Sequence, residues 1–295
     1  MRQMKNRPRD LIPLILLPGA AIFILRPLLP AWGTLFAVAF SIFYGFKWLT
    51  YTRAVRMGAE PTLKRTVGYI FFWVGMDAQA FFDIGARVRR PAASEWLSAF
   101  TKTASGIVLY FFAARLFYPA HTLTAGYIGL AGFLLFSFFG TFHLNSLLWR
   151  RRGVNASPIM NSPLLSSSLS DFWSSRWNLA FRDLARIFVF RPVMRRYGIV
   201  SAVIAAFAFS GVLHDLLISL PARAWYGLPT LFFLIQAAGV LIEKSGTGVR
   251  LGLNRGKRGR TYAAAFVLAP LVLLFHPPSI ENCMVPFMKT LGALP

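Results

Sequence analysis

The sequence predicts an all-α protein that crosses a membrane several times. Of its 295 residues, 56% are hydrophobic and only 14% are charged, whereas a soluble domain carries roughly 25% charged residues. The apolar residues also gather in long runs, and basic segments separate these runs. Both observations are typical of polytopic membrane proteins. Without an internal repeat or a linker, the chain is expected to form one domain, residues 1–295.

The apolar runs give the expected elements in chain order, at about 11–25, 31–46, 67–84, 104–118, 123–148, 197–220, 226–242 and 262–276. A helix needs about 20 apolar residues to cross a bilayer, so these runs predict about 7–9 transmembrane helices. The run at 67–84 contains Gly75 and Asp77. We expect a re-entrant or broken segment there, because irregular backbone at membrane depth requires cover by protein or water.

The basic segments set the expected orientation. Segments 1–10, 47–66, 85–103, 149–196 and 243–261 are strongly positive, and excess Lys and Arg marks cytoplasmic loops. If 67–84 does not cross fully, the N-terminus is cytoplasmic and the C-terminus lies outside. A multi-pass protein of a bacterial inner membrane is favoured over one of the endoplasmic reticulum. The net charge of +22 then reflects contact with an anionic leaflet, and no nucleic-acid partner is expected.

The longest basic segment, 149–196, contains a motif-rich stretch. Its first part, Asn155–Ser170, is rich in Ser, Pro and Asn and reads as a loop. Ser170 or Asp171 is a suitable N-cap for a helix that begins at Phe172. Aromatic residues then recur at helical spacing, which predicts a cytoplasmic-interface helix near 171–190. In one continuous helix, Asp171 and Asn178 share a face.

His214 is the leading candidate for chemistry, since it interrupts the apolar run FSGVLHDLLIS. An ionisable residue inside a membrane is expensive and often functional. A neutral imidazole can accept a hydroxyl proton, which suggests a general base. Ser210 and Gly211 lie one turn earlier and are expected to leave space beside the ring. Asp215 points about 100° away around the helix, so it is not the expected partner. The alternative is a histidine that packs between helices.

Asn178 closes the run DFWSSRWN. Its amide can bind a substrate carbonyl or fix a histidine tautomer, although the residue type alone favours a polar contact between helices. The arginines of this segment suit phosphate binding, but most of them are explained by the positive-inside rule. Arg176 is the exception, because it lies between two tryptophans beside Asn178. The sequence contains no metal-ligand spacing, so no metal is expected.

The stretch NSPLLSSSLSDFWSSRWN, followed by VLHD in an apolar run, resembles the membrane-bound O-acyltransferase superfamily, and most closely its wax synthase-like branch. The resemblance covers roughly residues 70–220, and Gly75–Asp83 is similar to a second element of bacterial members. Ser174 departs from the glycine often found there. The matching residues are Ser162, Pro163, Ser168, Leu169, Asp171, Phe172, Trp173, Arg176, Trp177, Asn178 and His214.

The resemblance implies transfer of an acyl group from acyl-CoA to a hydroxyl of a lipid or other alcohol acceptor. It implies catalytic roles for His214, as general base, and for Asn178. Acyl-CoA is then a co-substrate and no permanently bound cofactor is expected. The oligomeric state is left open. The residues expected to bind substrate are Asp171, Trp173, Arg176 and Trp177.

Two other functions stay open at this point. One is a proton-coupled transporter of a lipid or small anion, with His214 as the proton relay. It predicts paired broken helices or an internal repeat, and only the segment near 67–84 is interrupted. The other is a family member that has lost catalysis and acts as a scaffold. The presence of both Asn178 and His214 speaks against it.

Overall fold

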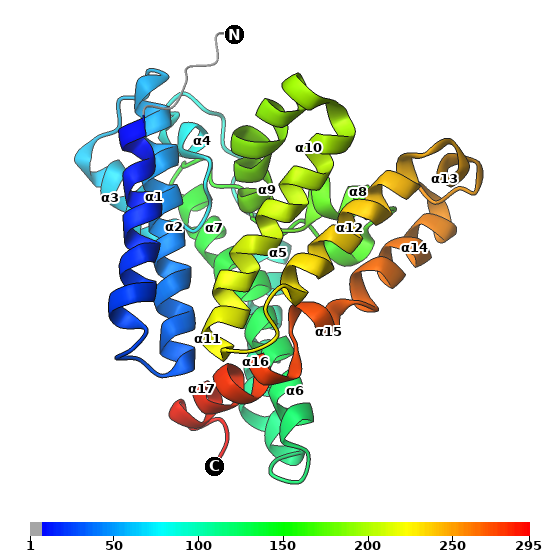
Figure 1. Ribbon diagram of the computed structural model, residues 1–295. Helices are drawn as coiled ribbons and strands as arrows, with labels where there is room; N and C mark the ends of the chain where they lie inside the picture. Colours follow the sequence, from blue (N-terminus) through cyan, green and yellow to red (C-terminus); the bar gives the residue numbers. More distant parts are fainter. Residues whose placement is uncertain (1–7) are drawn as a thin grey trace.

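The computed structural model describes residues 8–295, and every regular element in that range is a helix (Figure 1). The all-α prediction is confirmed for this part of the chain. The predicted cytoplasmic N-terminus rests partly on residues 1–7, which lie outside the described residues.

The helices follow one another with short connections. The first half of the chain contains α1 (Pro8–Ala20), α2 (Ala31–Arg56), α3 (Leu63–Phe72), α4 (Ala78–Phe82), α5 (Ala93–Val108), α6 (Thr122–Leu134) and α7 (Phe142–Arg151). The second half contains α8 (Leu169–Asp171), α9 (Leu179–Ala185), α10 (Arg191–His214), α11 (Leu220–Ala222), α12 (Leu228–Lys244), α13 (Gly246–Arg250), α14 (Gly256–Leu268), α15 (Leu271–Leu274), α16 (Pro277–Ser279) and α17 (Val285–Thr290).

Several of these helices join into longer, apolar ones. By length and composition, four stretches of the described chain could cross a membrane: Ala31–Arg56, Ala93–Leu116, Thr122–Arg151 and Leu179–Ala222. The pair Gly256–Leu274 and Pro277–Thr290, bent by 62°, raises the number to five if it is counted as one span. These apolar helices support an integral membrane protein, while seven to nine crossings stay a prediction.

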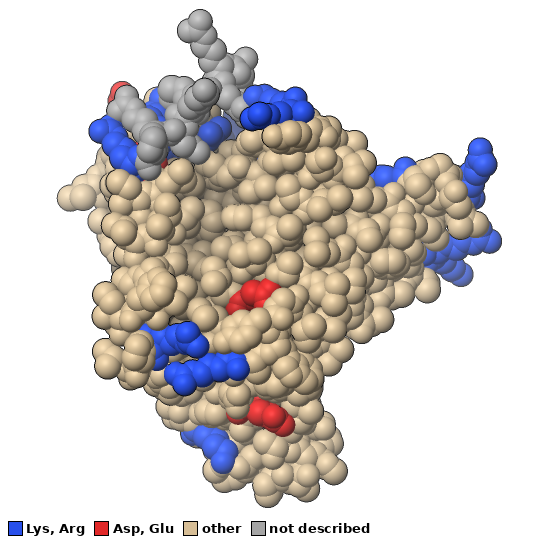
Figure 2. Space-filling view, viewed as in Figure 1, with Lys and Arg blue, Asp and Glu red and all other residues tan. Residues whose placement is uncertain are grey.

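The long helices run back and forth between two ends of the molecule. The first, which we call the basic end, is where α2 finishes, α5 begins and α7 finishes. At the second end, α2 begins, α6 begins and α11 finishes (Figure 1). Ion pairs join neighbours at the basic end: Arg56 with Asp10 (2.6 Å) and Arg150 with Glu95 (2.6 Å). Figure 2 shows Lys and Arg near the top and at the tip of the α13–α14 arm, with a broad, mostly uncharged belt below.

Lys47 corrects the prediction of where the second apolar run ends. The sequence places a basic loop at 47–66, but α2 continues to Arg56 and the Lys47 side chain is fully buried, at 0% exposure. Its Nζ donates to the Gly75 carbonyl (2.6 Å) and lies 3.7 Å from the centre of the Tyr69 ring. A cation placed over an aromatic face is attracted to it, which lowers the cost of burial.

The chain between α3 and α4 is broken, in the range where the sequence predicts a re-entrant or broken segment. Trp73 adopts extended backbone where α3 ends, and Asp77 caps α4 by accepting from the Ala80 amide (2.9 Å). The Phe72 carbonyl at the break accepts from Asn145 Nδ2 (2.9 Å) and Trp149 Nε1 (3.0 Å). The position of this segment in a membrane stays a prediction.

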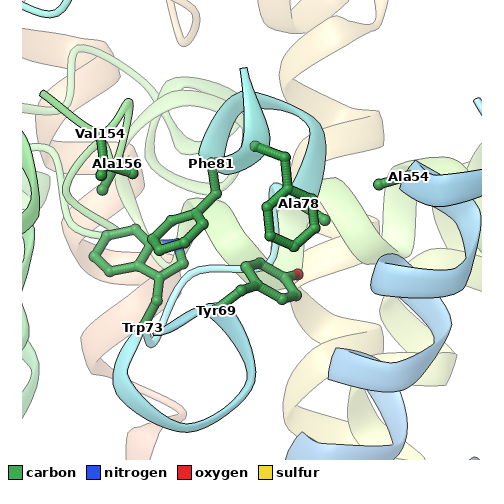
Figure 3. Close-up of a cluster of buried hydrophobic side chains, with 8 residues drawn as sticks. Ala54, Tyr69, Trp73, Ala78, Phe81, Val154 and Ala156 are labelled. Carbon is green, nitrogen blue, oxygen red and sulfur yellow. The ribbon is translucent and has the colours of Figure 1, made fainter. Parts of the chain in front are cut away.

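Buried aromatic rings hold the broken segment in place. Figure 3 shows the rings of Tyr69, Trp73 and Phe81 gathered between α2 and the loop that follows α7. Protein therefore covers the irregular backbone, as membrane-embedded irregular backbone requires. The buried members of this cluster are Ala54, Tyr69, Trp73, Ala78, Phe81, Phe82, Val154 and Ala156.

Candidate functional site

The predicted interface helix near 171–190 is two helical pieces with a sharp break between them. The Ser168 hydroxyl, not Ser170 or Asp171, caps the first piece by accepting from the Asp171 amide (3.1 Å). That piece continues as a π-helical turn to Arg176 and stops. Asn178 then adopts a left-handed backbone, with φ of +39°, and begins α9. Asp171 and Asn178 therefore do not share one helix face.

Asn178 explains the break through its own side chain. Asparagine tolerates left-handed backbone better than most residues do. Its Oδ1 accepts from the Phe181 amide (3.2 Å), which satisfies one of the unpaired donors at the start of α9. The amide nitrogen Nδ2 has no hydrogen-bond partner within residues 8–295. The side chain thus caps a helix with one atom and keeps a donor free with the other.

The loop before the motif stabilises the break by pairing with it. The Asn161 amide donates to the Arg176 carbonyl (2.8 Å), and the Leu179 amide donates to the Ile159 carbonyl (2.8 Å). These bonds use backbone groups that an uninterrupted helix would have paired internally. The Ser- and Pro-rich loop is therefore a part of the motif's structure.

Asp171 and Arg176 form an ion pair inside the motif. Arg176 Nε donates to Asp171 Oδ2 (2.7 Å), and the same oxygen accepts from the Ser167 amide (3.0 Å). Desolvation raises the pKa of Asp171, but the Ser167 amide and the Arg176 guanidinium outweigh it, so the net pKa is lowered. Arg176 also donates to the Ser162 carbonyl (3.3 Å). Two guanidinium nitrogens are thus engaged within the protein, and phosphate binding by Arg176 stays a prediction.

Trp173 connects the motif to α12, which packs against the helix that carries the histidine. Its Nε1 donates to Gln236 Oε1 on α12 (3.2 Å), and its ring lies 5.7 Å from the Phe233 ring. Phe233 in turn lies 4.6 Å from the His214 ring. Trp177 faces another way and stacks on Phe172, with ring centres 5.5 Å apart. Of the two tryptophans, only Trp173 reaches the surroundings of His214 by these contacts.

His214 is half-buried, and its tautomer follows from one hydrogen bond. The Ser210 carbonyl lies 2.7 Å from Nδ1. A carbonyl can only accept, so Nδ1 carries the proton in this bond. In the neutral ring Nε2 is then an unprotonated acceptor, and it has no hydrogen-bond partner within residues 8–295. This is the form that a general base requires.

The surroundings of His214 agree with one prediction and correct another. The Asp215 carboxylate bonds to the Gly227 amide (2.7 Å), the Thr230 amide (3.1 Å) and the Thr230 hydroxyl, so it is not the partner of His214. The predicted space at Gly211 is wrong, because α12 fills it. A Cβ on Gly211 would lie 2.6 Å from the Thr230 Cα.

Asn178 and His214 are not joined by a direct hydrogen bond within residues 8–295. Their helices meet through Phe181 and Phe209, whose rings stack 6.0 Å apart. Joint action on one substrate stays a prediction, with the substrate as the expected bridge.

Three buried polar residues near these elements escaped the sequence analysis. Gln236 is fully buried, and its Nε2 donates to the Phe266 carbonyl (2.7 Å). Glu243 is also fully buried, and its carboxylate accepts from the amide and hydroxyl of Ser170. Lys47 is the third. The available signal was a polar residue inside or at the edge of an apolar run, the same one that marked His214.

Comparisons with known proteins find one matching family model and several similar acyltransferases. The model of the membrane bound O-acyl transferase family matches residues 156–235, which include both the motif and His214. Among curated proteins, a long-chain-alcohol O-fatty-acyltransferase of Simmondsia chinensis is 29% identical over 143 residues, or 44% of this chain and 40% of the relative.

Two proteins of Arabidopsis thaliana are similar as well. The probable long-chain-alcohol O-fatty-acyltransferase 1 is 31% identical over 163 residues, covering 50% of this chain and 46% of the relative. The acyl-CoA–sterol O-acyltransferase 1 is 28% identical over 140 residues, covering 42% and 39%. The chain spans less than half the length of each relative. Residues 156–235 therefore match the model of the membrane bound O-acyl transferase family, and the chain is similar to the long-chain-alcohol O-fatty-acyltransferases named above.

Proposed function

We propose that this protein transfers an acyl group from acyl-CoA to the hydroxyl of a long-chain alcohol or another lipid alcohol, with His214 as the general base. The observation that carries the proposal is the hydrogen bond from Nδ1 to the Ser210 carbonyl. This bond leaves Nε2 of His214 free to accept a proton within an apolar helix. The relatives named above are acyltransferases, which supports this reaction over the transporter alternative.

The proposed reaction is a direct transfer. As the acceptor oxygen attacks the thioester carbonyl, its proton moves to Nε2 of His214 and a C–O bond forms. The tetrahedral intermediate then collapses, the C–S bond breaks, and the thiolate of CoA takes the proton from the imidazolium. The products are an ester, free CoA and neutral His214. General-base assistance of this kind contributes about 10²–10⁴-fold to a rate.

Asn178 is proposed to stabilise the oxyanion of that intermediate. The structure supports this role because Oδ1 is engaged as the cap of α9, which directs the donor Nδ2 away from the backbone it caps. A preorganised amide donor suits a developing negative charge. The left-handed backbone at this position fixes the side chain, since a residue held by strain and a cap has few other conformations.

A pocket at the basic end supports the proposal of acyl-CoA as the donor. It has a volume of about 480 Å³ and is lined by Arg90, Arg151 and the ring of Trp96. Guanidinium groups bind phosphates in bidentate fashion, and an indole ring offers a face on which adenine can stack. These are the two chemical parts of the CoA head group.

The test compares membranes that contain the wild type or His214→Ala at matched protein levels. Each receives labelled palmitoyl-CoA and a long-chain alcohol, and the products are read by mass. The wild type is expected to form the wax ester. His214→Ala is expected to form it at a rate at least about 10²-fold lower. In a second arm free palmitate replaces the thioester, and no ester is expected.

His121→Ala is the matched control, because His121 is an exposed residue at the start of α6 in a short connection. It should retain the wild-type rate. Normal turnover by a well-folded His214→Ala protein would refute the general-base mechanism. Absence of ester from the wild type with long-chain alcohols, sterols and diacylglycerols alike would refute the proposed acceptor class.

A further inference from the structure

A second pocket with two arginines lies at the end of the molecule opposite to the basic end. It has a volume of about 440 Å³ and forms where the α1–α2 connection meets the end of α11. Arg26 and Arg223 line it from these two segments, together with Asn282. Figure 2 shows Lys and Arg side chains gathered over this region, at the lower left of the view. Folding has thus brought together cations that are far apart in the sequence.

Neither arginine has a partner for its charge in the described part of the chain. No ion pair or side-chain hydrogen bond involves Arg26 or Arg223 within residues 8–295. The Nε atom of Arg26 is buried and unpaired, which is costly for a charged donor. No acidic residue lines the pocket. The pocket therefore offers positive charge and N–H groups without a partner among the described residues, both of which suit an added anion.

The first turn of α2 adds donors on the same side. Pro30, Ala31 and Thr34 line the pocket, and Pro30 caps the helix without a side-chain hydrogen bond. The first amides of this 26-residue helix are thus unpaired, and the positive end of its dipole adds to the charge of the arginines.

Buried and partly buried hydrogen bonds hold the wall that carries Arg223 in place. Asn282 Nδ2 donates to the Ala222 carbonyl (3.0 Å), and Ser219 lies 3.1 Å from Nε2 of the buried His276. The Ser279 amide donates to Nδ1 of His276 (3.3 Å), so in the neutral ring Nε2 carries the proton and donates a hydrogen bond to the Ser219 hydroxyl oxygen. This serine–histidine pair is consequently a structural contact, not an activated nucleophile.

We propose that this pocket binds a phosphate group. Two guanidinium groups and a helix N-terminus offer more donors than the two oxygens of a carboxylate can accept, whereas the several oxygens of a phosphate suit them. Exposed apolar side chains precede the pocket in the α1–α2 connection, with Phe23 82% and Leu28 76% exposed. They would lie against acyl chains, so the phosphate of an anionic lipid and a soluble phosphate ester share the chemistry that this pocket recognises.

The experiment measures ligand binding to the purified protein by native mass spectrometry, and it is independent of acyl transfer. The probes are dioleoyl phosphatidylglycerol and glycerol 3-phosphate, added separately. The wild type is expected to bind at least one of them. Arg26→Gln and Arg223→Gln are each expected to weaken it about tenfold, the effect of losing one charged hydrogen-bonding group. Arg26→Lys should recover part of the loss, because lysine keeps the charge without the planar fork.

Lys289→Gln is the matched control. Lys289 is exposed at the same end of the molecule and does not line the pocket. Its replacement by Gln removes the same charge as each arginine variant does. It should bind both probes as the wild type does, and helical content should be equal in all variants. Binding of the lipid alone identifies a lipid phosphate as the ligand, and binding of glycerol 3-phosphate identifies a soluble ester. Failure of both probes to bind, or equal binding by the wild type and the arginine variants, overturns the proposal.

Discussion

One carbonyl oxygen determines which nitrogen of His214 can act. Ser210 accepts from Nδ1, so the acceptor lone pair is at Nε2, on the far side of the ring. The sequence could place His214 in an apolar helix but could not choose between its two nitrogens. The contact between His214 and Phe233 could not be predicted from the sequence either, because Phe233 belongs to a separate apolar run with many equivalent residues.

The Asp171–Arg176 pair gives a prediction for pH dependence. The pKa of Asp171 is lowered in the folded protein from its ordinary value of 3.8. Its contribution to stability is therefore complete above that value and is lost as the pH falls through the lower, folded value. Asp171→Asn should destabilise the protein by about 1 kcal/mol at neutral pH. The measurement is the thermal unfolding midpoint in detergent from about pH 2 to 8, so that the range extends below the ordinary pKa of the carboxyl.

The difference in unfolding midpoint between the wild type and Asp171→Asn should be constant from pH 5 to 8 and should become smaller below pH 4. Asp183→Asn is a suitable comparison, because Asp183 pairs with the neighbouring Arg182 (2.9 Å) at a more exposed site. A difference that persists unchanged at the lowest pH would show that ionisation of Asp171 is not the source of its effect.

At the scale of elements, the crossing of α10 and α12 sets the surroundings of His214. Gly211 allows the Thr230 backbone to approach, and Thr230 is in turn tied to Asp215. Gly211→Val would place a branched side chain where α12 already lies, and overpacking costs about 1–3 kcal/mol. We expect a lower unfolding midpoint and a loss of acyl transfer of at least tenfold, because Phe233 on α12 moves relative to His214.

Gly246→Ala serves as the control, since a Cβ there meets nothing within 4 Å. It should resemble the wild type in both the unfolding midpoint and the rate of acyl transfer. Full activity in Gly211→Val would mean that the distance between these helices does not matter for the reaction.

The elements also show where prediction from sequence stops. Apolar runs located most long helices, because burial in a membrane leaves a strong signal in composition. The break at Asn178 left no such signal. Aromatic spacing favours one helix through 171–190, whereas the structure shows that the cap at Asn178 and the pairing of the 159–161 loop with Arg176 and Leu179 together turn the chain. Long-range pairing of this kind depends on the folded arrangement, which a local pattern does not contain.

At the scale of the whole molecule, the separation of the two ends gives a test of orientation. Cys283 is the single cysteine, so a Cys283→Ala background contains no other thiol. Arg90→Cys and Lys289→Cys then place exposed thiols at the basic end and the second end. With a membrane-impermeant maleimide on intact cells, Lys289→Cys should be labelled and Arg90→Cys should react only after permeabilisation, in line with the positive-inside rule.

Labelling of Arg90→Cys from outside, with protection of Lys289→Cys, would reverse the predicted orientation. It would also place the pocket lined by Arg90 and Arg151 on the side without cytoplasmic CoA, and the proposed donor would fail with it. The same labelling experiment therefore checks topology and donor access together.

Lys47 has a consequence for how the protein enters its membrane during synthesis. Helix α2 emerges from the ribosome before residues 69–75, which supply the ring and the carbonyl that contact the buried Lys47 Nζ. Inserted alone, α2 would carry an unpaired lysine into the bilayer at a cost of about 2.5–3.5 kcal/mol. We therefore expect α2 to wait at the translocon until the α3–α4 segment arrives, so that both are released into the lipid as one unit.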